Sequence, residues 1–294
     1  MKQINRLLVI ISMMMLGTFS TFAQEDLEAL LNDQDNQTSF VSATFKNTRV
    51  LNGHSVEMMK PHELEFRISH RFGQLNSGAY DLWGMDNANI HFSLEYGIND
   101  WLNVGIGRGT YQKTFDGFVK ARLLRQSTGA KSSPVSLTIL GTVAVNSMKD
   151  QAMQDYFSNR LSYVTGVMVA RKFNSKLSLQ FAPHFVHRNF VETSSDLNDL
   201  IALGFGGRYK LSNRVSLNFE YFYVLDPAYN NPSIQTYNPL SIGVDIETGG
   251  HVFQIHLTNS LAMIEKGFIG ETTGNWLNAG IHLGFNISRV FTLN

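Results

Sequence analysis

Strict alternation of apolar and polar side chains over residues 240–259 is the feature that most restricts the fold of this chain. In its first half, apolar residues alternate with polar or small ones, namely Leu240, Ile242, Val244 and Ile246 with Ser241, Gly243, Asp245 and Glu247. After Gly249-Gly250 the alternation resumes, with Phe253, Ile255 and Leu257 against Gln254, His256 and Thr258. Because successive side chains of a strand point to opposite faces, the stretch predicts a β-hairpin with one apolar and one polar face.

The same two-residue period recurs from Glu63 to the C-terminus and predicts about twelve strands. They lie near residues 63–71, 90–96, 102–107, 114–125, 134–147, 158–172, 175–188, 198–210, 213–225, 240–247, 251–259 and 276–290. Many of these runs exceed the roughly five or six residues that are usual in soluble proteins. They approach the roughly nine to eleven residues that a tilted strand needs to cross a bilayer.

Short and long connections alternate between the predicted strands. The connections near 97–100, 174–175, 211–213 and 248–250 are short, whereas those near 73–86, 189–196, 226–237 and 260–275 are long. Short periplasmic turns and long outer loops are typical of outer-membrane barrels. In hydrocarbon every backbone N–H and C=O must be paired, so the sheet has to close. We therefore expect an all-β, transmembrane, antiparallel up-and-down barrel rather than a soluble β-sandwich, with both chain ends on the periplasmic side.

The N-terminal residues have the anatomy of a secretory signal peptide. Lys2 and Arg6 flank the start of an apolar run over residues 7–16, and Thr21-Phe22-Ala23 forms a small-residue cleavage site. The run is shorter than the roughly 20 apolar residues of a membrane-spanning helix. We predict a cleaved signal peptide at residues 1–23, a short N-terminal periplasmic segment at residues 24–60, and the barrel at residues 61–294.

The segment at residues 24–60 admits three interpretations. Residues 25–32 have the spacing and acidic start of a short helix, and Asn52-Gly53 is a strong turn pair. The segment can form an ordered periplasmic tail, an extra strand or an inward-folded plug. Of these we favour the tail.

Charge and cysteine content exclude several classes of function. Lys and Arg together number 24, as do Asp and Glu, so no net charge favours nucleic acid or an anionic surface. The chain has no cysteine, which excludes disulfides, cysteine-ligated metal and a lipid-bearing cysteine. We expect no cofactor and no nucleic-acid partner.

A set of short motifs is distributed over most of the chain that follows the predicted signal peptide. They include Ala43-Thr44-Phe45-Lys46, Leu51-Asn52-Gly53-His54-Ser55, Ile68-Ser69-His70-Arg71-Phe72-Gly73, Asp86-Asn87-Ala88-Asn89-Ile90, Phe115-Asp116-Gly117 and the run from Ser241 to His251. Together they resemble an uncharacterised family of outer-membrane β-barrels from Bacteroidetes. The resemblance implies export and a barrel fold, and it carries over no catalytic residue.

Ionisable side chains in the inward phase of the predicted strands are the candidate site residues. They are Glu65, Arg67, Arg71, His91, Glu95, Lys120, Arg122, Arg208, Glu220, Asp245, Glu247, His256 and His282. Both signs of charge occur, so they do not predict a ring selective for one ion sign. Opposite charges on neighbouring strands can pair across the lumen, and we favour such a lattice over a lumen that passes small solutes.

Catalytic and metal-binding interpretations are weaker. His91, His184, His256 and His282 are predicted to point inward, and we favour ordinary hydrogen bonding over ligation of metal or haem. Ser260 and His256 lie on the same predicted face, but roughly 13 Å of extended strand separates them, too far for proton transfer. We expect no enzymatic activity and no metal site.

These observations lead to a bacterial outer-membrane barrel that is either a narrow small-solute channel or an occluded structural barrel. The alternative is a membrane anchor or scaffold for an envelope complex, held through a periplasmic partner of residues 24–60. A barrel-embedded hydrolase is the weakest interpretation. The partners implied by the fold are outer-membrane lipid and the barrel-assembly machinery.

Overall fold

The computed structural model describes residues 37–149, 156–191, 196–225 and 235–293. The predicted signal peptide and the predicted helix at residues 25–32 lie outside these ranges. Two compact units are distinguished. In the smaller unit, which includes residues 37–41 and 126–134, strand β1 (Ser39–Phe40) pairs antiparallel with β6 (Ser127–Thr128).

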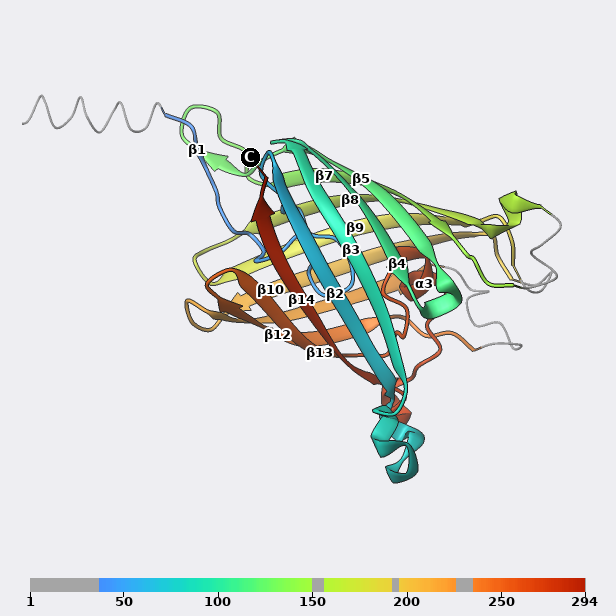
Figure 1. Cartoon of the computed structure of the whole chain (residues 1–294). Helices are drawn as coiled ribbons and strands as arrows, with labels where there is room; N and C mark the ends of the chain where they lie inside the picture. The colour runs from blue at the N-terminus through green and yellow to red at the C-terminus, as the bar shows by residue number, and fades with distance from the viewer. Residues whose placement is uncertain (1–36, 150–155, 192–195, 226–234, 294) are drawn as a thin grey trace, which may run out of the picture. The chain divides into compact units, whose positions relative to one another are not determined.

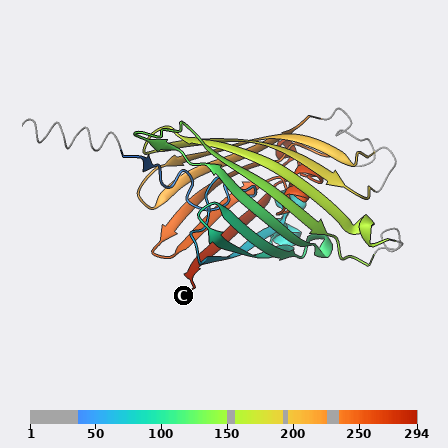
Figure 2. The same ribbon diagram turned by 90° about the horizontal axis from the view of Figure 1, so that it is seen from above.

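The larger unit is a closed barrel of twelve antiparallel strands (Figure 1, Figure 2). The strands are β2 (Glu63–Gln74), β3 (Ala88–Asn99), β4 (Leu102–Gly109), β5 (Phe115–Leu124), β7 (Ser136–Val145), β8 (Leu161–Lys172), β9 (Leu177–Arg188), β10 (Asp199–Lys210), β11 (Val215–Val224), β12 (Leu240–Thr248), β13 (His251–Thr258) and β14 (His282–Thr292). Each strand pairs with the next in the chain, and β14 closes the ring on β2. The predicted fold class and strand number are confirmed.

Short helical turns and one α-helix occur in the connections. They are η1 (Leu75–Ser77), η2 (Ala79–Gly84), η3 (Tyr111–Lys113), η4 (Phe157–Arg160), α3 (Glu265–Gly270) and η6 (Trp276–Asn278). The end of the barrel where β2 begins and β14 ends also carries the two-residue turn at Gly249-Gly250. We call it the turn end, and we call the opposite end, where β13 leads into the 259–281 connection, the loop end.

The last strand begins later than the sequence pattern predicts. The alternation suggests a strand from Trp276, but residues 276–278 form η6 and Ala279 adopts a left-handed backbone with φ of 58°. The indole N–H of Trp276 donates to the carbonyl of Leu240 at 3.2 Å. The prediction was wrong here because the left-handed residue interrupts the extended chain, so that β14 starts only at His282.

The outward face of the barrel is apolar and exposed. Ile106 is 65% exposed, Ile255 52% and Ile242 47%, and each lies within a strand of the closed sheet. A closed sheet leaves no edge of unpaired backbone groups, and an apolar exterior of this kind suits hydrocarbon as its solvent. Within the described ranges, no helix has the length and apolar character needed to span a membrane.

The inward face is divided into a polar and a largely apolar wall. Buried polar and charged side chains dominate on β2, β3, β13 and β14. On β7 to β10 many buried inward positions are apolar, including Leu140, Val164, Met168, Val186 and Leu200, with Gln180 and His184 among the polar ones. The predicted polar inner face is therefore present on only some of the twelve strands. The reason is that the apolar wall packs against other segments inside the barrel.

Substituting Ile255 by Arg will test the lipid-facing assignment. The charge will lie near the middle of β13 and will reduce the free energy of unfolding of the vesicle-inserted protein by about 2–4 kcal/mol. Urea titration of the vesicle-inserted protein measures the change. Leu277→Arg, at a 96% exposed position in η6, is the matched control and will be close to neutral. An equal effect of both substitutions contradicts the assignment.

Candidate functional site

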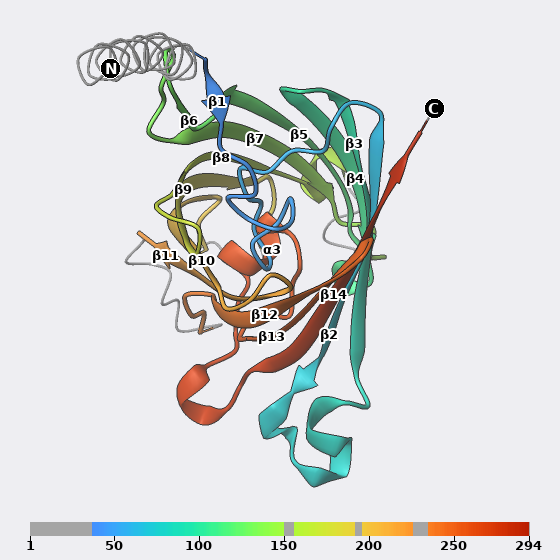
Figure 3. The same cartoon turned by 90° about the vertical axis from the view of Figure 1, so that its left-hand side faces the viewer.

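Residues 43–59, which we call the plug segment, lie inside the barrel. Figure 3 looks along the barrel and shows this blue segment, with α3 beside it, within the ring of strands. Thr48, Leu51, His54 and Ser55 are each no more than 1% exposed. The favoured interpretation of this stretch as a periplasmic tail is therefore wrong for residues 43–59, because their polar groups bond to the inner wall. The plug interpretation describes them instead.

The plug segment folds into a small hairpin. The amide of Val50 donates to the carbonyl of Gly53 at 2.9 Å, and the amide of Ser55 donates to the carbonyl of Thr48 at 2.8 Å. Its tip is the Asn52-Gly53 turn that the sequence indicates. A Cβ atom on Gly53 would lie 3.0 Å from the Phe222 ring, so the tip fits closely against the wall.

Glu220 of β11 binds the tip of the plug segment. Its carboxylate accepts hydrogen bonds from the amides of Leu51, Asn52 and Gly53 at 3.3, 3.2 and 3.0 Å. Glu220 is 3% exposed, and a buried carboxylate needs such donors because it has left water. The tip of the plug segment therefore supplies the hydrogen-bond donors that the buried Glu220 carboxylate requires.

Arg71 and two amide side chains hold the other side of the tip. Arg71 donates to Oδ1 of Asn52 at 2.5 Å and to Oδ1 of Asn286 at 3.2 Å. Asn286 donates in turn to the carbonyl of Leu51 at 3.0 Å, and Gln254 donates to that of Val50 at 2.9 Å. Groups from β2, β13 and β14 thus bond both the side chain and the backbone of the plug segment.

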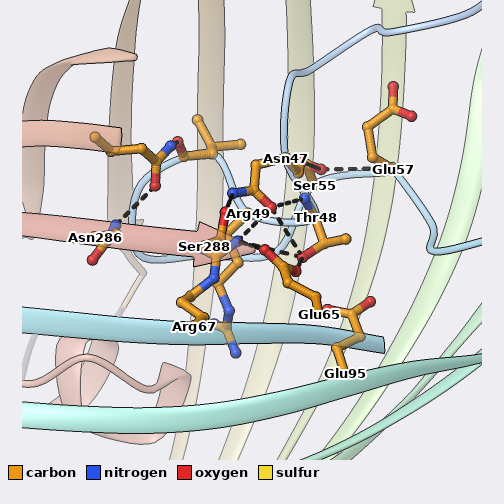
Figure 4. A network of polar contacts seen from close by, with 12 residues as sticks. Asn47, Thr48, Arg49, Ser55, Glu57, Glu65, Arg67, Glu95, Asn286 and Ser288 are labelled. Atoms are coloured by element: carbon orange, nitrogen blue, oxygen red, sulfur yellow. Dashed lines mark hydrogen bonds and ion pairs between the residues drawn. The ribbon is translucent and has the colours of Figure 1, made fainter. Parts of the chain in front are cut away.

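A second network fixes the plug segment near β2 and β14 (Figure 4). Glu65 accepts from Thr48 Oγ1 at 2.7 Å and forms an ion pair with Arg67 at 3.0 Å. Arg67 also donates to Oδ1 of Asn47 at 2.6 Å. The amide nitrogen of Asn47 donates to Ser288 Oγ, again at 2.6 Å. These side chains are buried, so each bond is protected from water.

Lys120 joins the plug segment to a third part of the wall. Its ammonium group donates to the carbonyl of Glu57 at 2.8 Å and pairs with Glu95 at 2.9 Å. Glu95 also accepts from Asn103 at 2.7 Å. Opposite charges on β3 and β5 therefore pair inside the barrel across the intervening β4, and Lys120 also bonds the plug segment.

The connection between β13 and β14 enters the lumen at the loop end, and α3 is buried throughout. It meets the plug segment in the ion pair between Arg49 and Glu265, at 3.0 Å with both side chains less than 10% exposed. Lys266 pairs with Glu271 at 2.8 Å and also donates to Gln112 of the β4–β5 connection. The plug segment and this inward connection therefore hold each other.

His54 lies at the contact between the plug segment and the inward connection. Its Nε2 is 3.8 Å from Glu265, and its ring packs edge-on against Phe118 at 4.5 Å between centroids. Burial, followed by the positive charges of Arg49, Lys120 and Arg67, lowers the pKa of His54 well below its usual range. The neutral imidazole is the form that fits this position.

The remaining candidate residues occupy the inward phase of their strands, several of them near the turn end. Arg122 and Arg208 are half-buried and donate to the carbonyls of Asp100 and Ala43. Glu247 pairs with Lys46 of the plug segment. Asp245 is buried and accepts from Gln254 at 2.9 Å.

The inward histidines are dispersed. His91 pairs with Asp116 at 2.7 Å, and His282 bonds the carbonyl of Phe72 at 2.8 Å. His256 is 2% exposed. Among the residues that the structure describes, no three or more histidine or carboxylate side chains are grouped so that they could hold a metal ion. Ser260 Oγ donates to the carbonyl of Ala262 at 3.2 Å, a bond that serves the loop and does not activate the hydroxyl.

Several residues of the site were not among the sequence candidates. They are Asn47, Thr48, Arg49, Asn52 and His54 of the plug segment, Gln180, Gln254, Asn286 and Ser288 of the wall, and Glu265, Lys266 and Glu271 of the inward connection. The sequence candidates are ionisable residues on predicted strands, so they include neither amide side chains nor loop residues. Leu261-Ala262-Met263-Ile264 and Phe268-Ile269 are unusually apolar for an outer loop, and this signal indicates an inward connection.

Residues 45–291 match a family described as "Membrane bound beta barrel domain (DUF5777)". Curated protein sequences give no match.

Solved structures with a similar arrangement of strands include porins and channels. The NanC porin is 8% identical, with a TM-score of 0.48 over 79% of this chain and 100% of that chain. An outer membrane channel from Pseudomonas putida F1 is 12% identical, with a TM-score of 0.45 over 80% and 97%. An active-site mutant of outer membrane phospholipase A from Escherichia coli is 11% identical, with a TM-score of 0.44 over 82% and 95%.

Replacing Glu220 by Ala will loosen the plug segment, because it leaves three buried amides without an acceptor. Each unpaired amide costs about 1–3 kcal/mol. Trypsin will cleave after Arg49 faster than in the wild type, and Glu220→Gln, which retains an acceptor oxygen, will give an intermediate rate. Asp199→Ala removes a carboxylate from an exposed pair with His187 and serves as the control. Unchanged cleavage in Glu220→Ala contradicts the assigned role.

Acid will destabilise the packed plug through His54. Since its pKa is lowered in the packed state, the stability it contributes is present above the ordinary value near 6.5 and is lost as pH falls below it. The loss is at most about 1.4 kcal/mol per pH unit. In urea titrations from pH 7.5 to 5, the stability advantage of the wild type over His54→Gln will therefore shrink. A constant difference between the two proteins excludes this role.

Proposed function

We propose that this chain, which belongs to the family of membrane bound beta barrel domains (DUF5777), is a self-plugged barrel of the bacterial outer membrane. In its resting state the plug segment and the inward connection occupy the lumen, so the barrel is occluded. It becomes a narrow passage for small solutes only when the plug segment leaves. An exported precursor with a cleaved signal peptide, and an origin in Bacteroidetes, belong to the same proposal.

One observation carries this proposal: polar groups from many strands of the wall are bonded to the plug segment. Glu220, Arg71 and Lys120 each bond it directly, from β11, β2 and β5. A buried charge that loses its partner costs about 3–5 kcal/mol, so these bonds favour the closed state. In an open lumen the same three side chains would be hydrated again. This hydration offsets part of the cost of breaking their bonds, so the plug segment can be released.

The interpretation as an anchor for a periplasmic complex gains less support. Residues 43–59 lie inside the barrel and bond to its wall, so a periplasmic partner would have to bind the residues that precede residue 43. A hydrolase gains least, since Ser260 bonds a loop carbonyl. We expect no enzymatic activity. Outer-membrane lipid and the barrel-assembly machinery remain the partners that we propose.

Planar-bilayer recordings test the occlusion directly. The wild type will show no unitary current. A release variant, Glu220→Ala with Arg71→Ala, will conduct, because the tip of the plug segment loses its main acceptor and donor on the wall. Asp199→Ala will stay silent like the wild type.

Folding of each variant is checked by its heat-modifiable mobility on gels. If the release variant does not fold, Arg49→Gln with Glu265→Gln is the substitute, since it removes the ion pair between the two inward segments and keeps polar side chains at both positions. A steady unitary current through the wild type overturns the proposal, as does silence of every folded release variant.

A further inference from the structure

The two walls of the lumen differ in chemistry and lie across the ring from each other. In the strand order of the barrel, β7 to β10 lie opposite β13, β14, β2 and β3. The first group presents Leu140, Met168 and Val186, each fully buried. The second presents charged and amide side chains. A lumen built only for ions or sugars has no use for a broad apolar wall, because water wets such a surface poorly.

The plug segment has a matching pair of faces. Phe45, Val50 and Val56 belong to the cluster that includes Leu140, Met168 and Ala182 of the apolar wall. On its other side, Asn47 and Asn52 bond to Arg67, Ser288 and Arg71 of the polar wall and to Ser241 of the adjoining β12. The lumen therefore already holds one amphipathic occupant, which is a piece of the chain itself.

Around the hairpin tip, release of the plug segment leaves one charge of each sign, Arg71 and Glu220, without its plug partner. Away from the tip it also separates Glu265 from Arg49 and Glu247 from Lys46. Arg67 keeps Glu65, and Lys120 keeps Glu95, so these ion pairs stay within the wall. The groups that lose partners include the Gln254 and Asn286 amides, which bond backbone carbonyls of the plug. Glu220 loses the amides that it accepts. Groups of this kind recognise hydroxyl and amide functions.

From this complementarity we propose that the opened lumen takes amphipathic molecules, with an apolar body and an uncharged head bearing hydroxyl or amide groups. The apolar body replaces Phe45, Val50 and Val56 on the apolar wall. The head replaces the hairpin tip at Gln254, Asn286 and Glu220. This inference rests on the proposed function, since the ligand enters only after the plug segment leaves.

Current blockade in planar bilayers tests the ligand class in the full-length Arg49→Gln, Glu265→Gln release variant, which keeps Gln254, Asn286 and Glu220. Glucose and octyl glucoside, used below its micelle concentration, share the same head and differ in the alkyl chain. We expect octyl glucoside to interrupt the current with residence times at least about tenfold longer than those of glucose, because the chain is buried on the apolar wall. Bilayers without protein control for effects of the amphiphile on the membrane.

Two further substitutions place the ligand on the wall. Met168→Gln keeps the side-chain length at a fully buried position of the apolar wall and will shorten the octyl glucoside blockades several-fold. Val167→Thr, one residue away on the outward face, will leave them unchanged.

The outcomes separate the two proposals. Equal blockade by glucose and octyl glucoside in a conducting release variant overturns the ligand class and leaves the gated passage intact. An unaltered blockade in Met168→Gln also overturns the ligand class. Folded release variants that carry no current overturn the proposed function, and the ligand class falls with it.

Discussion

The need of buried charges for partners governs the interior of this barrel. Closing the sheet satisfies the backbone of the strands but turns carboxylates and guanidinium groups into a confined space where isolated charges are costly. Some of them pair with each other, as Glu65 does with Arg67. Glu220 instead accepts hydrogen bonds from three backbone amides of the plug segment. The plug segment thus supplies hydrogen-bond partners for charged groups that the wall of the barrel buries.

The apolar wall adds a second, non-directional contribution. Phe222 and Val224 of β11 pack with Phe268 and Ile269 of α3 in one cluster, while Phe45 and Val56 join the other. Burial of apolar surface in this way favours the closed state irrespective of hydrogen-bond geometry. The inside of the barrel therefore resembles the core of a soluble domain on one side and a hydrogen-bonded network on the other.

The outward face was predictable from the sequence because lipid imposes a local rule. Residues that face lipid, such as Ile242 and Ile255, must be apolar regardless of their other contacts. Each strand therefore shows a two-residue period in its sequence, and counting these runs predicts the number of strands. The contacts of the plug segment follow no local rule. Asn47 and Ser288 are 241 residues apart in the chain, and Arg49 and Glu265 are 216 apart, so no window of sequence contains both partners. The Asn52-Gly53 turn was visible as a turn, but its acceptor on β11 was not.

The first and last strands of the barrel, β2 and β14, pair along a seam where the chain is not continuous, and one side chain of the plug segment bonds to both of them. The amide group of Asn47 accepts from Arg67 on β2 with its oxygen and donates to Ser288 on β14 with its nitrogen. Nearby, Arg71 of β2 donates to Asn52 and to Asn286 of β14, and Asn286 donates to the carbonyl of Leu51. The plug segment therefore cross-links β2 and β14. Its withdrawal removes these cross-links from the strand pair that joins the two ends of the barrel.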